Sequence, residues 1–322
     1  MRTFQQPRLL ISRCIEFDAC RWNGLMIASD IVKLLKPHVV FVPVCPEVEI
    51  GLGVPREPIR LVRTDDGLQL YQPATDSYWT RAMETFGVRF LEALPPLDGA
   101  ILKGRSPSCG IKDVKVYPAD PKGMPRKEGS GLFAAAVMAR WPHLAVEDEG
   151  RLTNYVIREH FLTRIFTLAA FREVKKQRSM GALVEFHAQN KLLLMAYREA
   201  HLRALGRIVA HHEHKPLPAV LDAYEEMLQQ ALARPPRRTT SINVLMHALG
   251  YFSEGLLSAE KAFFLECLED YRRGRVPLSV PISILRSWIV RFDQEYLREQ
   301  SFFEPYPQEL IQITDSGKGR PL

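Results

Sequence analysis

The stretch Pro7-Arg-Leu-Leu-Ile-Ser-Arg-Cys14 joins a short apolar run, which predicts a buried β-strand, to a cysteine directly after it. The same combination occurs twice more in the first third of the chain. The further pairs are Val39–Val44 with Cys45, and Gly99–Lys103 with Ser106-Pro-Ser-Cys109-Gly110. Ligand sites of open α/β sheets form at the carboxyl ends of the strands. We therefore expect Cys14, Cys45 and Cys109 to converge at one edge of a sheet.

Helical patterns alternate with these strands as far as about residue 145. The segments Gly24–Leu35, Asp76–Leu94 and Gly129–Ala139 each carry apolar residues at helical spacing. Strands that alternate with helices indicate an α/β fold, here an open, mainly parallel sheet flanked by helices.

The pattern changes near residues 146–149, and almost every later segment as far as about residue 300 has helical periodicity. Arg151–Gln177 and Leu183–His211 are the two longest candidate helices. We predict two domains: residues 1–148 form the α/β domain, and residues 149–322 form an all-α C-terminal domain.

The composition is that of a globular protein, with 46% hydrophobic and 25% charged residues among 322. No segment approaches the roughly 18 uninterrupted apolar residues of a membrane span, and the N-terminus lacks a signal-peptide core. The five cysteines are an odd number, which disfavours a disulfide framework. These features predict a cytoplasmic protein with reduced thiols and no membrane partner.

The net charge of +6 permits an anionic partner but does not require one. Taken singly, each basic cluster of the second half is best explained as a solvated helix end. Three such clusters in one half make nucleic-acid binding a serious alternative. The clusters are Arg172, Lys175, Lys176 and Arg178; Arg234, Arg237 and Arg238; Arg272, Arg273 and Arg275.

The loop after Cys45 places Glu47 and Glu49 two and four residues beyond the thiol, and the loop of Cys109 adds the hydroxyl of Ser106. Either loop alone is most simply a polar turn with a buried, inert thiol. Their shared position at strand ends favours one common site. Three cysteines are one short of a closed four-thiolate iron–sulfur site, and an iron without a protein ligand can bind a substrate. Such an iron would act as a Lewis acid toward a soft atom, for which sulfur is the natural choice.

The motifs of the first 160 residues together resemble the TudS thiouracil desulfidases. They are Ser12-Arg-Cys14, Cys20-Arg-Trp-Asn-Gly24, Pro43-Val-Cys-Pro-Glu47 and Ser106-Pro-Ser-Cys-Gly110. The second half is similar to the YbgA-like helical domain, in segments that include Lys191-Leu-Leu-Leu-Met-Ala196 and Asn243-Val-Leu-Met-His247. The fusion resembles the RudS type of desulfidase, which implies action on 4-thiouridine, as a free nucleotide or in transfer RNA.

The resemblance implies that Cys14, Cys45 and Cys109 hold a 4Fe–4S cluster with one iron lacking a protein ligand. It also implies that Glu47 activates or positions water and that Ser106 assists proton transfer. Cys20 matches a family cysteine too, so the choice between Cys14 and Cys20 as ligand stays open. Trp22 stands where the family usually has tyrosine, and Ile15-Glu-Phe17 replaces its usual Leu-Leu-Gly.

Two other functions remain possible at this stage. One is a nucleic-acid-binding protein whose cluster is structural or sensory, and the other is a desulfidase that acts only on free thiouracils. Glu47 and Ser106 beside the cysteines favour an enzyme, since a structural cluster needs neither.

The oligomeric state is not encoded in any of these patterns. Cys267, between Leu265 and Leu268 of a helix, is most simply a core residue.

Overall fold

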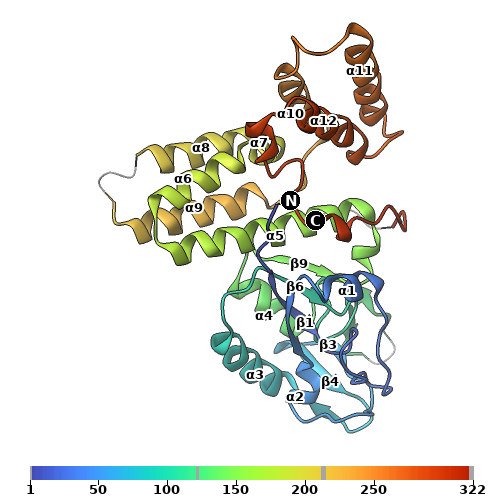
Figure 1. Ribbon diagram of the computed structural model, residues 1–322. Coiled ribbons are helices and arrows are strands. Elements are labelled where there is room, and N and C mark those ends of the chain that lie inside the picture. The colour runs from blue at the N-terminus through green and yellow to red at the C-terminus, as the bar shows by residue number, and fades with distance from the viewer. Residues whose placement is uncertain (1, 121–122, 212–214, 319–322) are drawn as a thin grey trace. The chain divides into compact units, whose positions relative to one another are not determined.

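The computed structural model describes residues 2–120, 123–211 and 215–318 (Figure 1). The described residues divide into two compact units: an N-terminal unit within residues 6–169 and 310–318, and a helical unit within residues 2–5 and 170–309. The division falls within helix α5 (Tyr155–Gln177). The domain boundary at residues 148 and 149 stays a prediction.

A parallel sheet of four strands forms the centre of the N-terminal unit, in the order β2-β1-β6-β9. Its strands are β1 (Arg8–Ser12), β2 (Val40–Val44), β6 (Gly99–Leu102) and β9 (Ala145–Asp148). The predicted parallel sheet is therefore confirmed, and β2, β1 and β6 are neighbours. Their carboxyl ends lie at one edge of the sheet, because all the pairings are parallel.

A second, mixed sheet has the order β5-β4-β3-β7-β8, and the sequence patterns do not predict it. Only the pair β3–β7 is parallel. The strands are β3 (Arg60–Thr64), β4 (Gly67–Gln72), β5 (Ser77–Tyr78), β7 (Lys115–Pro118) and β8 (Arg126–Lys127). They are short and rich in polar residues, so hydrophobic periodicity gives only a weak signal for them.

Helices flank the parallel sheet, as expected for this class of fold. They are α1 (Asp30–Leu35), α2 (Pro46–Glu49), α3 (Thr80–Ala93), α4 (Leu132–Arg140) and the first part of α5, which follows the short 3₁₀ helix η1 (Arg151–Thr153). Side chains of α3 and α4, including Met83 and Phe133, share a buried core with Leu10 and Leu102 of the sheet. Helix α5 approaches β6 closely, since a Cβ added at Gly99 would lie 2.8 Å from the side chain of Ile165.

The predicted helix Gly24–Leu35 is wrong in its first half, because only Asp30–Leu35 is helical. Gly24 has a φ of 68°, outside the helical region. Ile27 instead forms a β-bridge with Ile15, in which its N–H donates to the carbonyl of Cys14 at 2.8 Å. This bridge holds the loop that carries Cys20 against the end of β1.

The helical unit contains the rest of α5 and eight further α-helices among the residues that the structure describes. These are α6 (Met180–Gln189), α7 (Lys191–Tyr197), α8 (Glu199–Ala210), α9 (Leu217–Ala231), α10 (Arg238–Gly250), α11 (Ser258–Arg272), α12 (Ser279–Arg291) and α13 (Glu295–Arg298), before the 3₁₀ helix η2 (Gln308–Leu310). The predicted all-α domain is confirmed. None of the described helices is long and apolar enough to cross a membrane.

The single helix predicted for Leu183–His211 is in fact three helices. Asn190 ends α6, and its side-chain amide donates to the carbonyl of Phe186 at 2.8 Å, a local bond that competes with helix continuation. Arg198 lies between α7 and α8 with extended backbone, at φ −157° and ψ 110°. Neither interruption contains glycine or proline, so the sequence gives no strong signal for it.

The C-terminal segment of the chain returns to the N-terminal unit. Arg158 of α5 is buried, and its guanidinium donates to the carbonyls of Leu152, Gln312 and Thr314 at 2.6 to 2.9 Å. The carboxylate of Asp315 also accepts the N–H of Tyr155 at 3.1 Å. Truncating the chain near residue 165 would remove residues 312–315 and therefore their hydrogen bonds to Arg158 and Tyr155. Point variants of the full chain keep these bonds, so they are the better test of what the helical unit does.

Candidate active site

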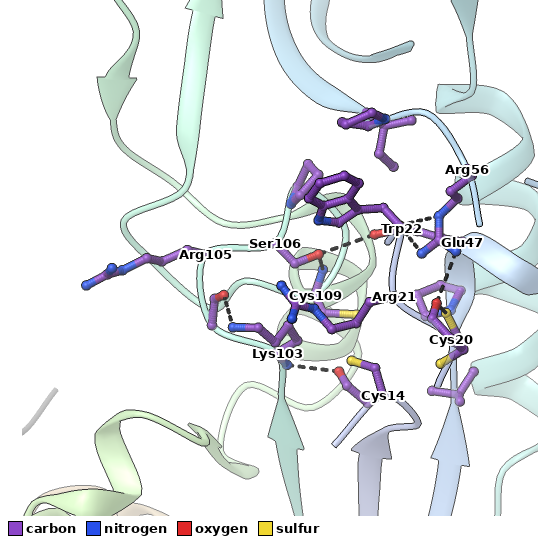
Figure 2. Close-up of a pocket in the computed structure, with 18 residues that line it drawn as sticks. Cys14, Cys20, Arg21, Trp22, Glu47, Arg56, Lys103, Arg105, Ser106 and Cys109 are labelled. Carbon is purple, nitrogen blue, oxygen red and sulfur yellow. Dashed lines mark hydrogen bonds and ion pairs between the residues drawn. The ribbon is translucent and has the colours of Figure 1, made fainter. Parts of the chain in front are cut away.

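The three strand-end cysteines line one cavity of about 330 Å³ in the N-terminal unit. Cys14 follows β1, Cys45 follows β2 and Cys109 follows β6, and all three thiols are buried. Cys20, Glu47 and Ser106 line the same cavity. Figure 2 shows the labelled cysteines gathered in one region of this pocket, with Glu47 and Ser106 beside them. The expected convergence is therefore present in the structure, together with a fourth thiol.

Hydrogen bonds between the strand ends fix the positions of these loops. The N–H of Arg13 donates to the carbonyl of Val44 at 2.7 Å, which ties the end of β1 to the end of β2. The N–H of Lys103 donates to the Ser12 hydroxyl at 2.9 Å, which ties β6 to β1. The loops therefore leave the sheet from a rigid edge, a favourable base for a preorganised site.

The four thiols interact with one another and with few other polar groups. Cys20 hydrogen-bonds through its side chain to Cys14 and Cys45, and the bond to Cys14 is the main cause of its raised pKa. The hydrogen bond to Cys20, together with burial, strongly raises the pKa of the Cys45 thiol. Burial raises the pKa of Cys109, and a side-chain hydrogen bond from Ser12 partly opposes it. In the metal-free protein the thiols of Cys45 and Cys109 are thus protonated at neutral pH.

No three described His, Cys, Asp or Glu side chains form a group that could hold a single metal ion. Cys267 does not line the cavity, since it lies buried in α11 of the helical unit. Its predicted place among core residues is borne out by this burial. All five cysteines are free thiols.

Glu47, the second residue of α2, has both carboxylate oxygens occupied by hydrogen-bond donors. Its Oε2 accepts from Nε and Nη2 of Arg56 at 2.9 and 2.5 Å. Its Oε1 accepts from the hydroxyls of Ser108 at 2.8 Å and Ser106 at 3.4 Å. The ion pair is largely shielded from solvent, with 4% of the Arg56 side chain and 13% of the Glu47 side chain exposed. The negative charge of Glu47 is therefore balanced by the positive charge of Arg56 in the wall of the cavity.

The Ser106 hydroxyl has a defined direction. Its Oγ accepts the backbone N–H groups of Ser108 and Cys109, both at 3.1 Å. Since a hydroxyl has two acceptor lone pairs and one donor hydrogen, its hydrogen is left for Glu47. Ser106 thus both stabilises the turn that presents Cys109 and faces the carboxylate.

Two residues of this network are not found by the sequence patterns. Arg56 lies nine residues beyond Glu47, and its Nη1 also donates to the carbonyls of Cys20 and Gly53 at 3.0 and 2.8 Å. Ser108 is fully buried, and the sequence treats it only as part of a polar turn. A buried arginine such as Arg56 needs a charged partner. The carboxylate of Glu47 fills that need, but no rule of sequence spacing connects residues 47 and 56.

Glu49, the other carboxylate of the Cys45 loop, does not line the cavity. It pairs with Arg13 at 3.2 Å, and 40% of its side chain is exposed. It lies two residues after Glu47, and a helix places such residues on different faces. Of the two carboxylates noted beside Cys45, only Glu47 therefore belongs to the site.

Comparison with known proteins gives two matching family models. Residues 9–149 match the family described as 2-thiouracil desulfurase, and residues 191–307 match the family described as a protein of unknown function, DUF1722. The chain belongs to the 2-thiouracil desulfurase family, and a DUF1722 domain follows. The suspected fusion of these two domains is thereby confirmed.

Curated relatives correspond to single halves of the chain. The uncharacterized protein YbgA of Escherichia coli (strain K12) is 30% identical over 158 residues, which cover 48% of this chain and 93% of that protein. The uncharacterized protein YbbK of Bacillus subtilis (strain 168) is 30% identical over 152 residues, covering 44% of this chain and 96% of that protein. A solved structure titled [4Fe-4S]-dependent thiouracil desulfidase TudS matches with a TM-score of 0.35 and 24% identity, over 46% of this chain and 93% of that chain.

We expect Gly131→Ala to disturb the loop that carries Cys109. A Cβ at residue 131 would lie 2.5 Å from the carbonyl carbon and oxygen of Ser108, so the loop must shift. Overpacking of this kind costs about 1–3 kcal/mol, which a lower thermal unfolding midpoint would report. Gly87→Ala in α3 is the matched control, because its Cβ would meet only the side chains of Ala136 and Phe133 in α4, at ordinary distances of 3.8 and 4.0 Å. Equal midpoints for Gly131→Ala and the wild type would contradict the close approach.

Proposed function

We propose that the protein is a desulfidase that replaces the thiocarbonyl sulfur of a thiolated uracil with oxygen. In the overall reaction, C=S and H₂O give C=O and H₂S, so no electrons are gained or lost. The convergence of Cys14, Cys45 and Cys109 with Glu47 and Ser106 around one cavity is the observation that carries this proposal. Membership of the 2-thiouracil desulfurase family supports the same reaction class.

The cavity has a donor set that suits a 4Fe–4S cluster. Its four thiols are the ligand type that such clusters take, and three separate loops present Cys14, Cys45 and Cys109 at their ends. Raised thiol pKa values mean that binding must displace protons, which the positive charge of iron favours. We assign Cys14, Cys45 and Cys109 as ligands, with Cys20 as the alternative to Cys14. The cluster would supply a Lewis-acidic iron, free of a protein ligand, for the substrate sulfur.

Glu47 and Ser106 are suited to holding the water that attacks the ring carbon. The hydroxyl of Ser106 lies 3.4 Å from Oε1 of Glu47, whereas the hydroxyl of Ser108 lies 2.8 Å from the same oxygen. A typical hydrogen bond from a hydroxyl is about 2.7–2.8 Å long, so the contact of Ser106 is weak. This weak contact is the position where a water molecule can enter and bridge the two groups. In our proposal Glu47 accepts the proton of that water, and Ser106 passes a proton onward to the departing sulfide.

The helical unit supports an extension of the proposal to 4-thiouridine in transfer RNA. Two of its basic clusters are paired with carboxylates: Lys175 with Asp222 and Glu225, and Arg272 and Arg273 with Glu269. By contrast, Arg234, Arg237 and Arg238 are exposed, and none of them forms an ion pair with a residue that the structure describes. We assign this last cluster, at the start of α10, as the contact to RNA phosphates. We place the protein in the cytoplasm, where its thiols stay reduced.

Substitution of any one of Cys14, Cys45 and Cys109 by alanine should abolish the cluster and sulfide release. Each variant removes one of three proposed thiolate ligands, and the measurement is the visible absorption and iron content after anaerobic reconstitution. Cys267→Ala is the control, because this thiol lies outside the cavity. Cys20→Ala tests which of Cys14 and Cys20 is the third ligand: Cys14 is the ligand if the cluster is lost in Cys14→Ala but kept in Cys20→Ala. An intact cluster in Cys109→Ala would overturn the ligand assignment.

Glu47→Gln should retain the cluster but lower turnover of 4-thiouridine about 10²- to 10⁴-fold, the usual contribution of a general base. Loss of the 4-thiouridine absorbance and the sulfide released are measured together. Glu49→Gln, two residues away and outside the cavity, should turn over near the wild-type rate. Normal turnover in Glu47→Gln would remove Glu47 from the mechanism, whereas absence of turnover in the wild type with its cluster intact would favour a structural or sensory cluster.

Substituting Arg234, Arg237 and Arg238 together by glutamine should weaken binding of thiolated transfer RNA. Each lost phosphate contact reduces the slope of log affinity against log salt by about 0.7–0.9, so three contacts reduce it by about 2–3. Turnover of free 4-thiouridine monophosphate should be unchanged. The matched control replaces Arg272, Arg273 and Arg275, which already pair with Glu269 and Asp270. Equal losses in the two triple variants would remove the assignment of the first cluster.

A further inference from the structure

The second sheet of the N-terminal unit carries a row of aromatic and cationic side chains across four neighbouring strands. Tyr78 of β5 lies opposite Tyr71 of β4, which in turn lies opposite Arg60 of β3. Tyr117 of β7 is on the same face, because it pairs with Val62, two residues after Arg60. We call the side chains of Tyr78, Tyr71, Arg60 and Tyr117 the tyrosine row.

The members of the tyrosine row contact one another from strand to strand. The ring centroids of Tyr71 and Tyr78 are 5.0 Å apart. The guanidinium carbon of Arg60 lies 5.6 Å from the ring centroid of Tyr71 and 4.7 Å from that of Tyr117, within the range of cation–π attraction. The row is therefore a continuous surface of rings and a planar cation, on which flat aromatic ligands can stack.

The tyrosine row lies on the face of the sheet that turns away from the core. Leu61, Leu70 and Val116 of the same strands belong to the buried core, so the row occupies the opposite face. Of Tyr78, 59% is exposed. Arg60 is half-buried and forms no ion pair with a residue that the structure describes, and its buried Nε has no hydrogen-bond partner there. The row thus offers an exposed ring together with an uncompensated positive charge.

Two lysines extend the positive charge of this face to β8. Lys115 and Lys127 are direct cross-strand partners in β7 and β8, both are exposed, and neither forms an ion pair with a described residue. Lys115 lies two residues before Tyr117 and is therefore on the same face as the row. Like charges directly opposite each other in a sheet are destabilising. An anion bound between the two ammonium groups would remove this repulsion.

The carboxylates near this face are already engaged. The five strands, all of which the structure describes, present no carboxylate on the face of the row. Asp76, in the turn between β4 and β5, accepts the hydroxyl of Tyr71 at 2.8 Å. Glu128, directly after β8, pairs at 2.8 Å with Arg63, which lies on the other face of β3. Exposed rings with uncompensated cations match the bases and phosphates of a nucleic acid rather than an acid-free apolar surface.

The tyrosine row begins beside the cysteine-lined cavity. Pro58 and Ile59 line that cavity, and Arg60 follows Ile59 directly. The side-chain amide of Gln72 donates to the carbonyl of Glu57 at 2.9 Å, which fixes this connection against the end of β4. An RNA strand with one base in the cavity can therefore lay its neighbouring nucleotides on this sheet.

We propose that the tyrosine row, together with Lys115 and Lys127, binds the nucleotides next to the thiolated base in RNA. Unpaired bases stack on Tyr78 and Tyr71, and phosphates contact Arg60 and the lysine pair. Sequence-distant bases released from a helix are commonly bound in this way, by stacking on aromatic side chains and arginine planes. The inference rests on the proposed action on transfer RNA, and it adds an RNA surface on the N-terminal unit itself.

Binding of transfer RNA to the full chain tests the stacking contact. Tyr78→Ala should weaken binding about 5- to 100-fold, the usual contribution of one stacked base, whereas Tyr78→Phe should bind like the wild type. Fluorescence anisotropy of labelled transfer RNA gives the affinities. Equal affinities for Tyr78→Ala and the wild type would contradict the stacking assignment.

The lysine pair is tested by the salt dependence of the same binding. Replacing Lys115 and Lys127 together by glutamine should reduce the slope of log affinity against log salt by about 1.4–1.8, which corresponds to two phosphate contacts. The double variant should also unfold at the same or a higher temperature than the wild type, because the repulsion is relieved. Arg63→Gln is the matched control on the opposite face and should keep the wild-type slope. An unchanged slope in the double variant would remove the pair from the RNA surface.

Kinetics and molar mass separate this proposal from its alternatives. In the reconstituted enzyme, Tyr78→Ala should lower kcat/KM for thiolated transfer RNA but not for free 4-thiouridine, which has no neighbouring nucleotides. Equal losses on both substrates would overturn the proposal. So would variants that bind transfer RNA normally but differ from the wild type in molar mass by light scattering, because the face would then join copies of the chain. If these residues bind transfer RNA but the wild type releases no sulfide from any thiolated substrate, the RNA surface stands and the proposed desulfidase function fails.

Discussion

The largely shielded carboxylate of Glu47 connects the segments that carry Cys20, Cys45 and Cys109. It accepts from Arg56, whose guanidinium also holds the carbonyl of Cys20, and from Ser108 and Ser106 in the loop of Cys109. Glu47 itself lies two residues after Cys45. Every cysteine loop except that of Cys14 is therefore tied to this side chain. The segments of Cys20, Cys45 and Cys109 therefore meet at an ion pair that contains no thiol, and a glutamine at residue 47 would keep an oxygen that can accept from Arg56.

This arrangement suits Glu47 both to a structural role and to the chemical role proposed for it. A carboxylate offers about four lone-pair positions, and Arg56 and Ser108 occupy three of them in well-formed bonds. The fourth is held only by the long contact to Ser106, at 3.4 Å. The strong bonds fix the direction of the carboxylate, and the weak one leaves it able to accept from water. Orientation by permanent partners and reactivity at the remaining position are what a preorganised general base requires.

The sequence predicts those parts of the molecule that follow from hydrophobic periodicity. The strands β1, β2 and β6 are apolar runs, and their parallel order brings Cys14, Cys45 and Cys109 to one edge. Hydrophobic periodicity does not predict contacts between polar residues that are distant in sequence. Arg56 meets Glu47 through a loop that also contains the cis peptide Val54–Pro55, and no spacing rule gives that path. The break at Asn190 depends on a side-chain hydrogen bond, and the second sheet depends on short polar strands, so neither has a periodic signal.

The charges of the two units suggest why they occur in one chain. Within the cavity, Arg56 and Lys103 are neutralised by Glu47 and Glu149. A free nucleotide has a base that is already accessible. A thiouridine stacked within a folded RNA must first leave its stack, at a cost of a few kcal/mol. In the proposed function, contacts to RNA phosphates offset that cost, and they come from Arg234, Arg237 and Arg238, which form no ion pair with a described residue. In the proposed function the N-terminal unit carries out the desulfuration, while the helical unit extends its reach to a thiolated base within RNA.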